Sequence, residues 1–286
     1  MKRVLGIFRA ACYSPGMVSR DGAILRAVME KLDENGYITH LIHEEDFSAE
    51  IPMPDVVFHM TRSPRALEIL QRWQKAGCRV VNSVEGIHRV ERASLAEWCA
   101  AQGISTPKTW IVDTACRDIE HMQTTNGQVE TISFPCWVKR AGDCAQQSED
   151  VCRVPDVDTY RQCLARFQVR GIVRAVVMEH LEGQCIKFYA VPNSDFFYWI
   201  PSDKLGYDKF SASMSASHCA HRTANEESVC FDFHYSIPCV PLEVYGGDVI
   251  IDSNGVARLI DLNDWPSFSA CREKAADAIA RLLLKE

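Results

Sequence analysis

Short apolar runs alternate with amphipathic segments over the first 83 residues of the chain. Runs rich in β-branched residues predict strands, and apolar residues spaced by three or four positions predict helices. Their order predicts a β-α-β-β-α-β unit, in which helices cover a parallel sheet. The predicted strands are residues 4–8, 38–43, 56–59 and 79–81, and the helical faces lie within 24–32 and 67–73.

Cap and turn residues mark the ends of these two helices. Asp21 is the predicted N-cap of the first, and Asn35-Gly36 is its left-handed stop. The second begins at Ser63-Pro64, an N-cap followed by proline at the first helical position, and ends at Gly77. Residues 9–16, after the first strand, lack the glycine-rich dinucleotide fingerprint. We therefore expect the carboxyl ends of these strands to present a small substrate.

The pattern changes beyond a predicted lobe boundary near residues 85–105. A short helix over 94–102 ends at Gly103, and strands with intervening turns then dominate, which predicts an α+β region. Residues 211–228 lack periodicity and predict a long mobile loop. The predicted strands are 136–139, 175–180, 186–191 and 196–200, with helices over 157–167 and 275–284.

Composition narrows the class of protein. The 286 residues carry 31 Lys and Arg against 38 Asp and Glu, a net charge of −7, so we expect no nucleic-acid partner. No apolar stretch is long enough for a membrane span or a signal-peptide core. The 13 cysteines form no C-x-x-C pair, which favours reduced, mostly buried thiols. We expect a cytoplasmic protein, and an oligomer is possible but not determined by sequence.

A hairpin near the C-terminus carries the candidate chemistry. Two apolar runs flank residues 252–255, where Asn-Gly is expected to supply the positive-φ residues of the turn. Antiparallel pairing brings Asp248 to the end of the hairpin that holds Asp261 and Asn263. Their oxygens on one face suit Mg²⁺ and, through it, phosphate. The alternative is that these carboxylates only keep strand ends solvated.

Several motifs in order resemble the ATP-grasp superfamily. The strand 134–139 resembles its lysine strand, 176–183 resembles its hinge, and 82–109 resembles the entry into its nucleotide domain. Together with the hairpin they cover residues 82–268, behind a matching N-terminal lobe. The closest likeness is to the carboxylate–amine ligases of the glutathione synthetase and ribosomal-protein glutamate ligase type, with some resemblance to inositol-phosphate kinases.

The resemblance implies a substrate lobe at 1–85 and an ATP-grasp domain at 86–286, divided near residue 180 into two lobes that clasp ATP. It implies ATP and one or two Mg²⁺ ions, with small-molecule carboxylate and amine substrates. Lys204 and Arg222 are expected to meet the substrate anion near the γ-phosphate. The implied nucleotide contacts are Arg92, Lys139, Glu179, His180, Leu181, Glu182 and Lys187, and the implied metal ligands are Asp248, Asp261 and Asn263.

The sequence leaves the reaction open. The first hypothesis is an ATP-dependent ligase that activates a carboxylate as an acyl phosphate and joins it to an amine or thiol. The alternative is a small-molecule kinase, favoured by Asp261 where ligases more often have glutamate. A nucleotide-binding module without catalysis is the third, because residues 140–150, where a phosphate-covering loop is expected, are acidic and hold one glycine. A zinc site could be drawn from His218, Cys219, His221, Cys230 and His234, but their spacing fits no ligand pattern, and a loop is the favoured interpretation.

Overall fold

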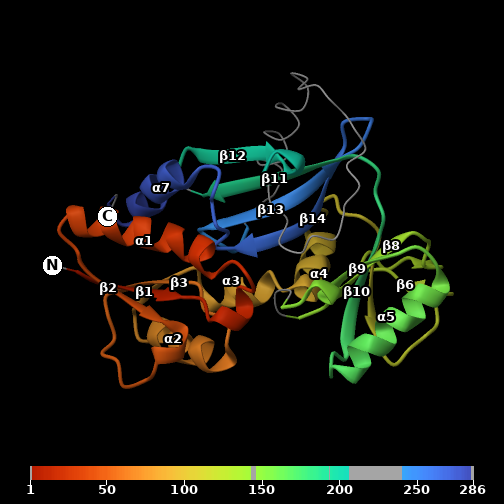
Figure 1. Cartoon of the computed structure of the whole chain (residues 1–286), viewed down its shortest axis with the longest axis horizontal. Helices are drawn as coiled ribbons and strands as arrows, with labels where there is room; N and C mark the ends of the chain where they lie inside the picture. Colours follow the sequence, from red (N-terminus) through yellow and green to blue (C-terminus); the bar gives the residue numbers. More distant parts are fainter. Residues whose placement is uncertain (1, 143–145, 193, 206–239, 285–286) are drawn as a thin grey trace.

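Three four-stranded sheets organise the chain (Figure 1). The structure is a computed structural model and describes residues 2–142, 146–192, 194–205 and 240–284. A parallel sheet forms the N-terminal lobe, and two antiparallel sheets form a middle lobe and a C-terminal lobe. The predicted α/β lobe followed by α+β lobes is therefore confirmed.

The N-terminal lobe is the predicted β-α-β-β-α-β unit. Its strands lie in the order β2-β1-β3-β4 and all pair in parallel. Helix α1 packs on one face of the sheet and α2 on the other. The elements are β1 (Arg3–Phe8), α1 (Val18–Glu34), β2 (Ile38–His43), β3 (Val56–His59), α2 (Pro64–Lys75) and β4 (Arg79–Val81), with short 3-10 helices at Ala11–Tyr13 and Glu44–Asp46.

The predicted caps are confirmed for α2 and wrong for the start of α1. Ser63 Oγ accepts from the Ala66 N–H, and Pro64 is the first helical residue. Helix α1 begins at Val18 instead of after Asp21. Asp21 lies buried in its first turn, where it accepts a 2.9 Å hydrogen bond from Ser14 Oγ. An acidic residue near a helix N-terminus is favoured by the helix dipole even when it is not the cap.

The middle lobe is an antiparallel sheet in the order β5-β10-β8-β9 with α5 on one face. Two helices, α3 and α4, connect it to the N-terminal lobe, and α4 begins two residues before the predicted start and ends at left-handed Gly103. The elements are α3 (Val84–Arg89), α4 (Arg92–Gln102), β5 (Thr109–Asp113), β6 (Met122–Gln123), β7 (Val129–Glu130), β8 (Cys136–Arg140), a 3-10 helix (Ser148–Asp150), β9 (Val151–Val154), α5 (Val157–Val169) and β10 (Arg174–Glu179).

The C-terminal lobe is an antiparallel sheet in the order β12-β11-β13-β14. Its β13-β14 hairpin is the predicted one, but only Gly255 of the turn has a positive φ, +77°. A bulge beside Asp248 and Val249 shifts the register of the pair. The elements are β11 (Gln184–Val191), β12 (Phe196–Pro201), a 3-10 helix (Ser202–Leu205), β13 (Tyr245–Ile251), β14 (Ala257–Asp264) and α7 (Arg272–Leu284).

The N-terminal and C-terminal lobes share their hydrophobic cores. One cluster joins Ile7 and Leu70 to Phe188 of β11, and another joins Leu25 of α1 to Ile279 of α7. The middle lobe has a core of its own between its sheet and α5. The cleft between the two antiparallel sheets therefore lies between bodies with separate cores.

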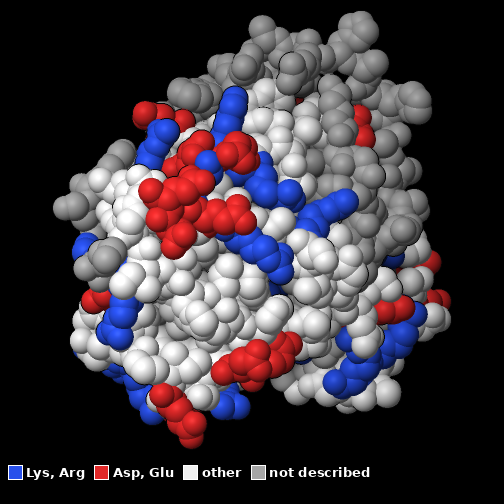
Figure 2. Space-filling view, turned by 60° about the vertical axis from the view of Figure 1, so that its left-hand side comes forward, with Lys and Arg blue, Asp and Glu red and all other residues white. Residues whose placement is uncertain are grey.

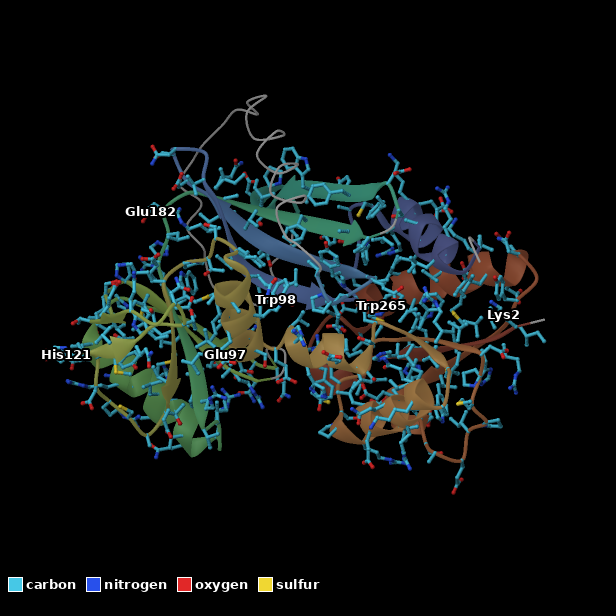
Figure 3. All side chains as sticks on the ribbon, turned by 180° about the vertical axis from the view of Figure 1, so that it is seen from behind. Lys2, Glu97, Trp98, His121, Glu182 and Trp265 are labelled. Carbon is cyan, nitrogen blue, oxygen red and sulfur yellow. The ribbon has the colours of Figure 1, made fainter. Side chains whose placement is uncertain are left out.

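A buried ion cluster also fastens the N-terminal lobe to the end of β14. Asp264, with a fully buried side chain, pairs with Arg62 and lies 3.4 Å from Arg9. Arg9 also donates to the Met60 carbonyl at 3.1 Å. The next residue, Trp265, is fully buried where β14 meets the N-terminal lobe, edge-on to Phe58 (Figure 3).

On the surface, charges of both signs lie close together. On the face shown in Figure 2, acidic and basic side chains neighbour one another. Lys31 of α1, for example, pairs with Glu273 at 2.8 Å and Asp277 at 2.7 Å on α7. Among the described residues no helix is both long and apolar enough to cross a membrane.

Candidate active site between the antiparallel sheets

The candidate site is a cleft between the middle lobe, α4 and the edge strand β14. Polar groups gather at one end of it, and an apolar wall lines the rest. The wall is built by Val176 and Met178, which alternate with core residues along β10 and so face away from α5. The polar end is formed by Arg92, Lys139 and Asp261.

Lys139 reaches across the cleft from β8. It lies on the face of β8 opposite to Val138, whose side chain is in the core under α5. Its Nζ donates a 3.0 Å hydrogen bond to the Ile260 carbonyl of β14. Burial lowers the pKa of Lys139, and this effect outweighs the attraction of the Asp261 carboxylate. Lys139, one of the nucleotide contacts implied by the resemblance, therefore lies on the cleft wall.

Asp248 and Lys187 form an ion pair on neighbouring strands. They are cross-strand partners in the β11-β13 register, and Lys187 Nζ lies 2.6 Å from Asp248 Oδ1. Burial disfavours the charged form of Lys187, but the facing Asp248 carboxylate outweighs it and raises the pKa of Lys187. The lysine thus stays a cation, paired with Asp248.

Asp261 faces Asp248 across the hairpin and lies among cations. The two are cross-strand partners in the β13-β14 register, so their side chains project from one face. Arg92, in the first turn of α4, approaches Asp261 to 3.7 Å. Burial opposes ionisation of Asp261, yet Arg92, Lys139 and Lys187 together lower its pKa. Asp261 is therefore held as a charged carboxylate by the cations around it.

Glycines let the hairpin strands approach closely at this point. A Cβ on Gly247 would lie 2.6 Å from the Asp261 carbonyl oxygen and 2.6 Å from the Phe188 ring. Gly246 is similarly close to the Phe188 carbonyl oxygen, at 2.6 Å. Positions 246 and 247, next to Asp248 in the sequence, therefore have no room for side chains.

Asp248, Asp261 and Asn263 form the candidate metal group. Asn263 is two residues after Asp261 and so lies on the same face of β14. Two carboxylates and an amide supply hard oxygen donors, which suit Mg²⁺. The donor set fits a divalent cation that shares its ligands with phosphate oxygens. The described residues hold no group of three or more His, Cys, Asp or Glu that could bind a metal, so any site here needs oxygens from Asn263 or a ligand.

The hinge between the middle and C-terminal lobes lies at the end of β10. Glu179 Oε1 accepts from the Lys108 N–H at 2.9 Å, which ties the hinge to the segment before β5. His180 Nδ1 accepts from Trp137 Nε1 at 3.0 Å, so its proton lies on Nε2, 3.3 Å from Glu182 Oε1. Glu182 itself projects from the connection to β11 (Figure 3).

Two groups at the site were not predicted from sequence. Trp137 and Cys185 precede Lys139 and Lys187 by two residues, and that spacing on a strand places each beside its lysine. Trp137 packs against the apolar wall. Burial raises the pKa of the Cys185 thiol to about 11, and Asp248 adds to this, so the group is a neutral thiol. The sequence signal for both residues was their position two residues before a predicted site lysine on a strand.

Arg9 and Arg62 do not line this cleft and are engaged with Asp264. Lys204 lies in the 3-10 helix after β12, with its side chain outside the described part. Arg222, the loop 211–228 and the five residues of the zinc alternative also lie outside the described residues.

Comparison with known proteins identifies the fold. No protein-family model and no curated protein sequence matches the chain. Solved structures do match over nearly the whole length of both chains. D-alanine–D-alanine ligase from Bacillus anthracis complexed with ATP is 13% identical with a TM-score of 0.65, covering 100% of this chain and 98% of that one. A RimK domain ATP-grasp protein from Sphaerobacter thermophilus is 13% identical with a TM-score of 0.68, covering 99% and 100%. VanG D-Ala:D-Ser ligase from Enterococcus faecalis is 13% identical with a TM-score of 0.69, covering 98% and 99%.

Proposed function

The chain has the ATP-grasp fold, and from this premise we propose that it is an ATP-dependent ligase. In the proposed reaction a small-molecule carboxylate is activated as an acyl phosphate and then joined to an amine or thiol. The observation that carries the proposal is a group of three basic side chains and two carboxylates at the cleft. Arg92, Lys139 and Asp261 line the cleft, and Asp248, the cross-strand partner of Asp261, pairs with Lys187. The names of the similar structures, which include ligases and one ATP complex, support it.

The proposed division of labour follows the lobes. Residues 1–85 form the substrate lobe, and residues 86–286 form the nucleotide domain, with ATP between its lobes near residue 180. We assign the adenine to the wall at Val176 and Met178 and to the hinge 179–182. We assign the phosphates to Lys139, Lys187 and Arg92, because basic side chains that are shielded from solvent on rigid strands and helices interact strongly with anions. Lys204 and Arg222 remain the proposed contacts of the substrate anion.

Mg²⁺ is the proposed metal at Asp248, Asp261 and Asn263. When bound, it would neutralise charge on the transferring phosphate and hold its oxygens in place. Lys187 and Arg92 already balance the two aspartates. Because cations and carboxylates are present in nearly equal number, the arriving phosphates can take over the cations as the carboxylates turn to the metal. The basic side chains can thus exchange the carboxylates for phosphates while the carboxylates bind the metal, so no charge is left without a partner when the nucleotide binds.

The chemistry requires the chain to orient two substrates and exclude water. A carboxylate oxygen attacks the γ-phosphorus, the bond to the ADP oxygen breaks, and an acyl phosphate forms. An amine or thiol then attacks the carbonyl carbon, phosphate leaves, and the nucleophile loses a proton. Lys139 and Arg92 are placed to balance the charge on the phosphoryl oxygens in the first step, because both border the cleft beside Asp261.

Binding of Mg²⁺-ATP to the native protein tests the shared premise. A ligand at 100 times its Kd stabilises the folded state by about 2.7 kcal/mol, which raises Tm by several degrees. We expect this shift in the wild type and in Lys75→Met, which alters an exposed lysine on α2. We expect Lys139→Met to lose most of it. An equal shift in both variants would remove Lys139 from the nucleotide site.

Product analysis separates the ligase from a kinase. The protein is incubated with Mg²⁺-ATP and pools of carboxylic acids and amines, singly and together. A ligase releases phosphate and ADP in proportion to a condensed product, and only when both substrates are present. A phosphorylated product without free phosphate would favour the kinase alternative and reject the ligase. The cytoplasmic location expected from the sequence remains a prediction.

A further inference from the structure

One aromatic side chain of the middle lobe is held by a hydrogen bond to the hinge. Trp137 lies on the face of β8 that also carries Lys139, because Cys136 and Val138, which alternate with it, are in the core under α5. Its indole packs against the apolar wall and is half-exposed. Its Nε1–H donates to His180 Nδ1 at 3.0 Å. We propose that Trp137 is a stacking platform for the nucleotide base and that His180 is a positioning residue that sets the plane of its ring.

Both nitrogens of the His180 ring have partners, which fixes the orientation of the ring. Nδ1 accepts from Trp137, and Nε2, which then carries the proton, lies 3.3 Å from Glu182 Oε1. The centroids of the indole and imidazole rings are 6.1 Å apart, and the rings are tilted by 50°. The backbone N–H of His180 also donates to the Pro135 carbonyl at 3.3 Å. His180 thus joins the hinge to the start of β8 through its backbone and its side chain.

The order of residues along the strands places Trp137 beside a bound base, and this step rests on the proposed function. Strands β8 and β10 are antiparallel, and Trp137 is opposite to Met178, one residue before the hinge residue Glu179. Lys139 lies two residues farther from the hinge along β8, which is about 7 Å on a strand. A nucleotide with its phosphates at Lys139 and its base at the hinge therefore passes the indole of Trp137.

A fixed indole suits the binding of a base. Every nucleobase has a flat π-face, and loss of an aromatic stacking partner weakens binding about five-fold or more. A side chain that must become ordered when the ligand binds lowers the affinity. The hydrogen bond to His180 orders the indole before the nucleotide arrives. Loss of this acceptor should therefore weaken binding of the base even though the indole itself is still present.

NMR of protein labelled with 15N-tryptophan tests the contact without any nucleotide. The chain has six tryptophans, and the indole signal of Trp137 is the one missing from Trp137→Phe. We expect His180→Leu to shift this signal and to speed its exchange with solvent, because the acceptor is lost. His180→Asn places an amide oxygen near the position of Nδ1 and should restore slow exchange. Equal exchange in the wild type and His180→Leu would refute the contact.

Tryptophan fluorescence tests the stacking. A base stacked on an indole quenches the indole emission, so Mg²⁺-ATP should quench the wild type and Trp98→Phe much more than Trp137→Phe. Trp98 is the matched control, because it is also half-buried but lies on α4 and packs against the core shared by the N-terminal and C-terminal lobes. Equal quenching in the two variants would overturn the stacking.

Nucleotide affinity tests both roles in variants that circular dichroism shows to be folded. We expect the Kd for Mg²⁺-ATP to rise about five-fold or more in Trp137→Ala and about three-fold in His180→Leu, and to return to the wild-type value in His180→Asn. An unchanged Kd in Trp137→Ala would reject the platform, and the fluorescence result decides if that variant is unfolded. An unchanged Kd in His180→Leu would reject the positioning role alone.

The proposed function can fail separately from the contact. If the wild type binds no Mg²⁺-ATP, the proposed function fails and the base platform fails with it. The hydrogen bond between Trp137 and His180 is then still judged by the exchange of the indole proton. If the wild type binds Mg²⁺-ATP while Trp137→Ala and His180→Leu bind it equally well, the proposed function stands and the platform is rejected.

Discussion

Asp264 provides a direct test of how the N-terminal lobe is held to the strand of the candidate site. Its carboxylate has no exposed surface, and it pairs with Arg62 and Arg9, whose side chains are 8% and 10% exposed. By strand alternation it lies on the face of β14 opposite to Asp261 and Asn263. One strand therefore presents the candidate metal ligands on one side and the lobe attachment on the other.

Asp264→Ala should strongly destabilise the protein. Removing one partner of a buried ion pair costs about 3–5 kcal/mol, because the remaining charge is left desolvated. Arg9 keeps its hydrogen bond to the Met60 carbonyl and its contact with Asp21 at 3.9 Å, which limits the loss. We therefore expect a loss near the lower limit, about 3 kcal/mol, in the free energy of unfolding.

Urea unfolding followed by circular dichroism and tryptophan fluorescence measures this loss. The matched control is Glu273→Ala, since Glu273 is 80% exposed and its pair with Lys31 also joins α1 to the C-terminal half. Exposed pairs contribute about 0–1 kcal/mol. The double variant Arg62→Met/Asp264→Leu should recover much of the loss, because no charge is left buried without a partner. Equal losses in Asp264→Ala and Glu273→Ala would refute the reasoning.

Three further predictions concern the core and the cleft. Burial lowers the pKa of His59 to about 4 from its ordinary value of 6.5. The stabilising contribution of neutral His59 is therefore complete above pH 6.5 and falls by about 3 kcal/mol as the pH drops to 4. The variant His59→Gln should flatten this part of the pH–stability profile, measured by urea unfolding. Gly247→Ala should cost about 1–3 kcal/mol, because its Cβ would meet the Asp261 carbonyl oxygen at 2.6 Å, whereas Gly142→Ala has open space; equal melting temperatures would contradict the crowding. Asp261→Asn should abolish Mg²⁺-dependent ATP turnover in protein that circular dichroism shows to be folded, and full turnover would remove Asp261 from the metal group.

Local patterns in the sequence determined most of the secondary structure. Strands, helix ends and the hairpin turn could be predicted because their signals act on the backbone within a few residues. Examples are the alternation of apolar residues along a strand, Ser63-Pro64 at a helix start and Gly103 at a helix end. The predicted start of α1 was wrong because Asp21 accepts a hydrogen bond from Ser14 instead of capping the helix, and its position in the sequence does not reveal this.

The candidate site could be predicted in part from the sequence for the same reason. Asp248, Asp261 and Asn263 lie on one predicted hairpin, and Lys139 lies on a strand with a clear pattern. The turn alone would pair Asp248 with Ile260, and only the bulge beside Asp248 brings Asp261 opposite to it. The basic side chains that pair with the two aspartates could not be predicted from the sequence. Lys187 faces Asp248 from β11, and Arg92 reaches Asp261 from α4, 169 positions earlier in the numbering (261 − 92).

Only the tertiary structure decided which distant charges meet. Arg9 and Arg62 carry the same charge as any surface arginine, and their use is fixed by the packing of the N-terminal lobe against β14. Secondary structure follows from short-range backbone and side-chain preferences, whereas the pairing of buried charges depends on how separate elements pack, for which a single sequence has no local signal.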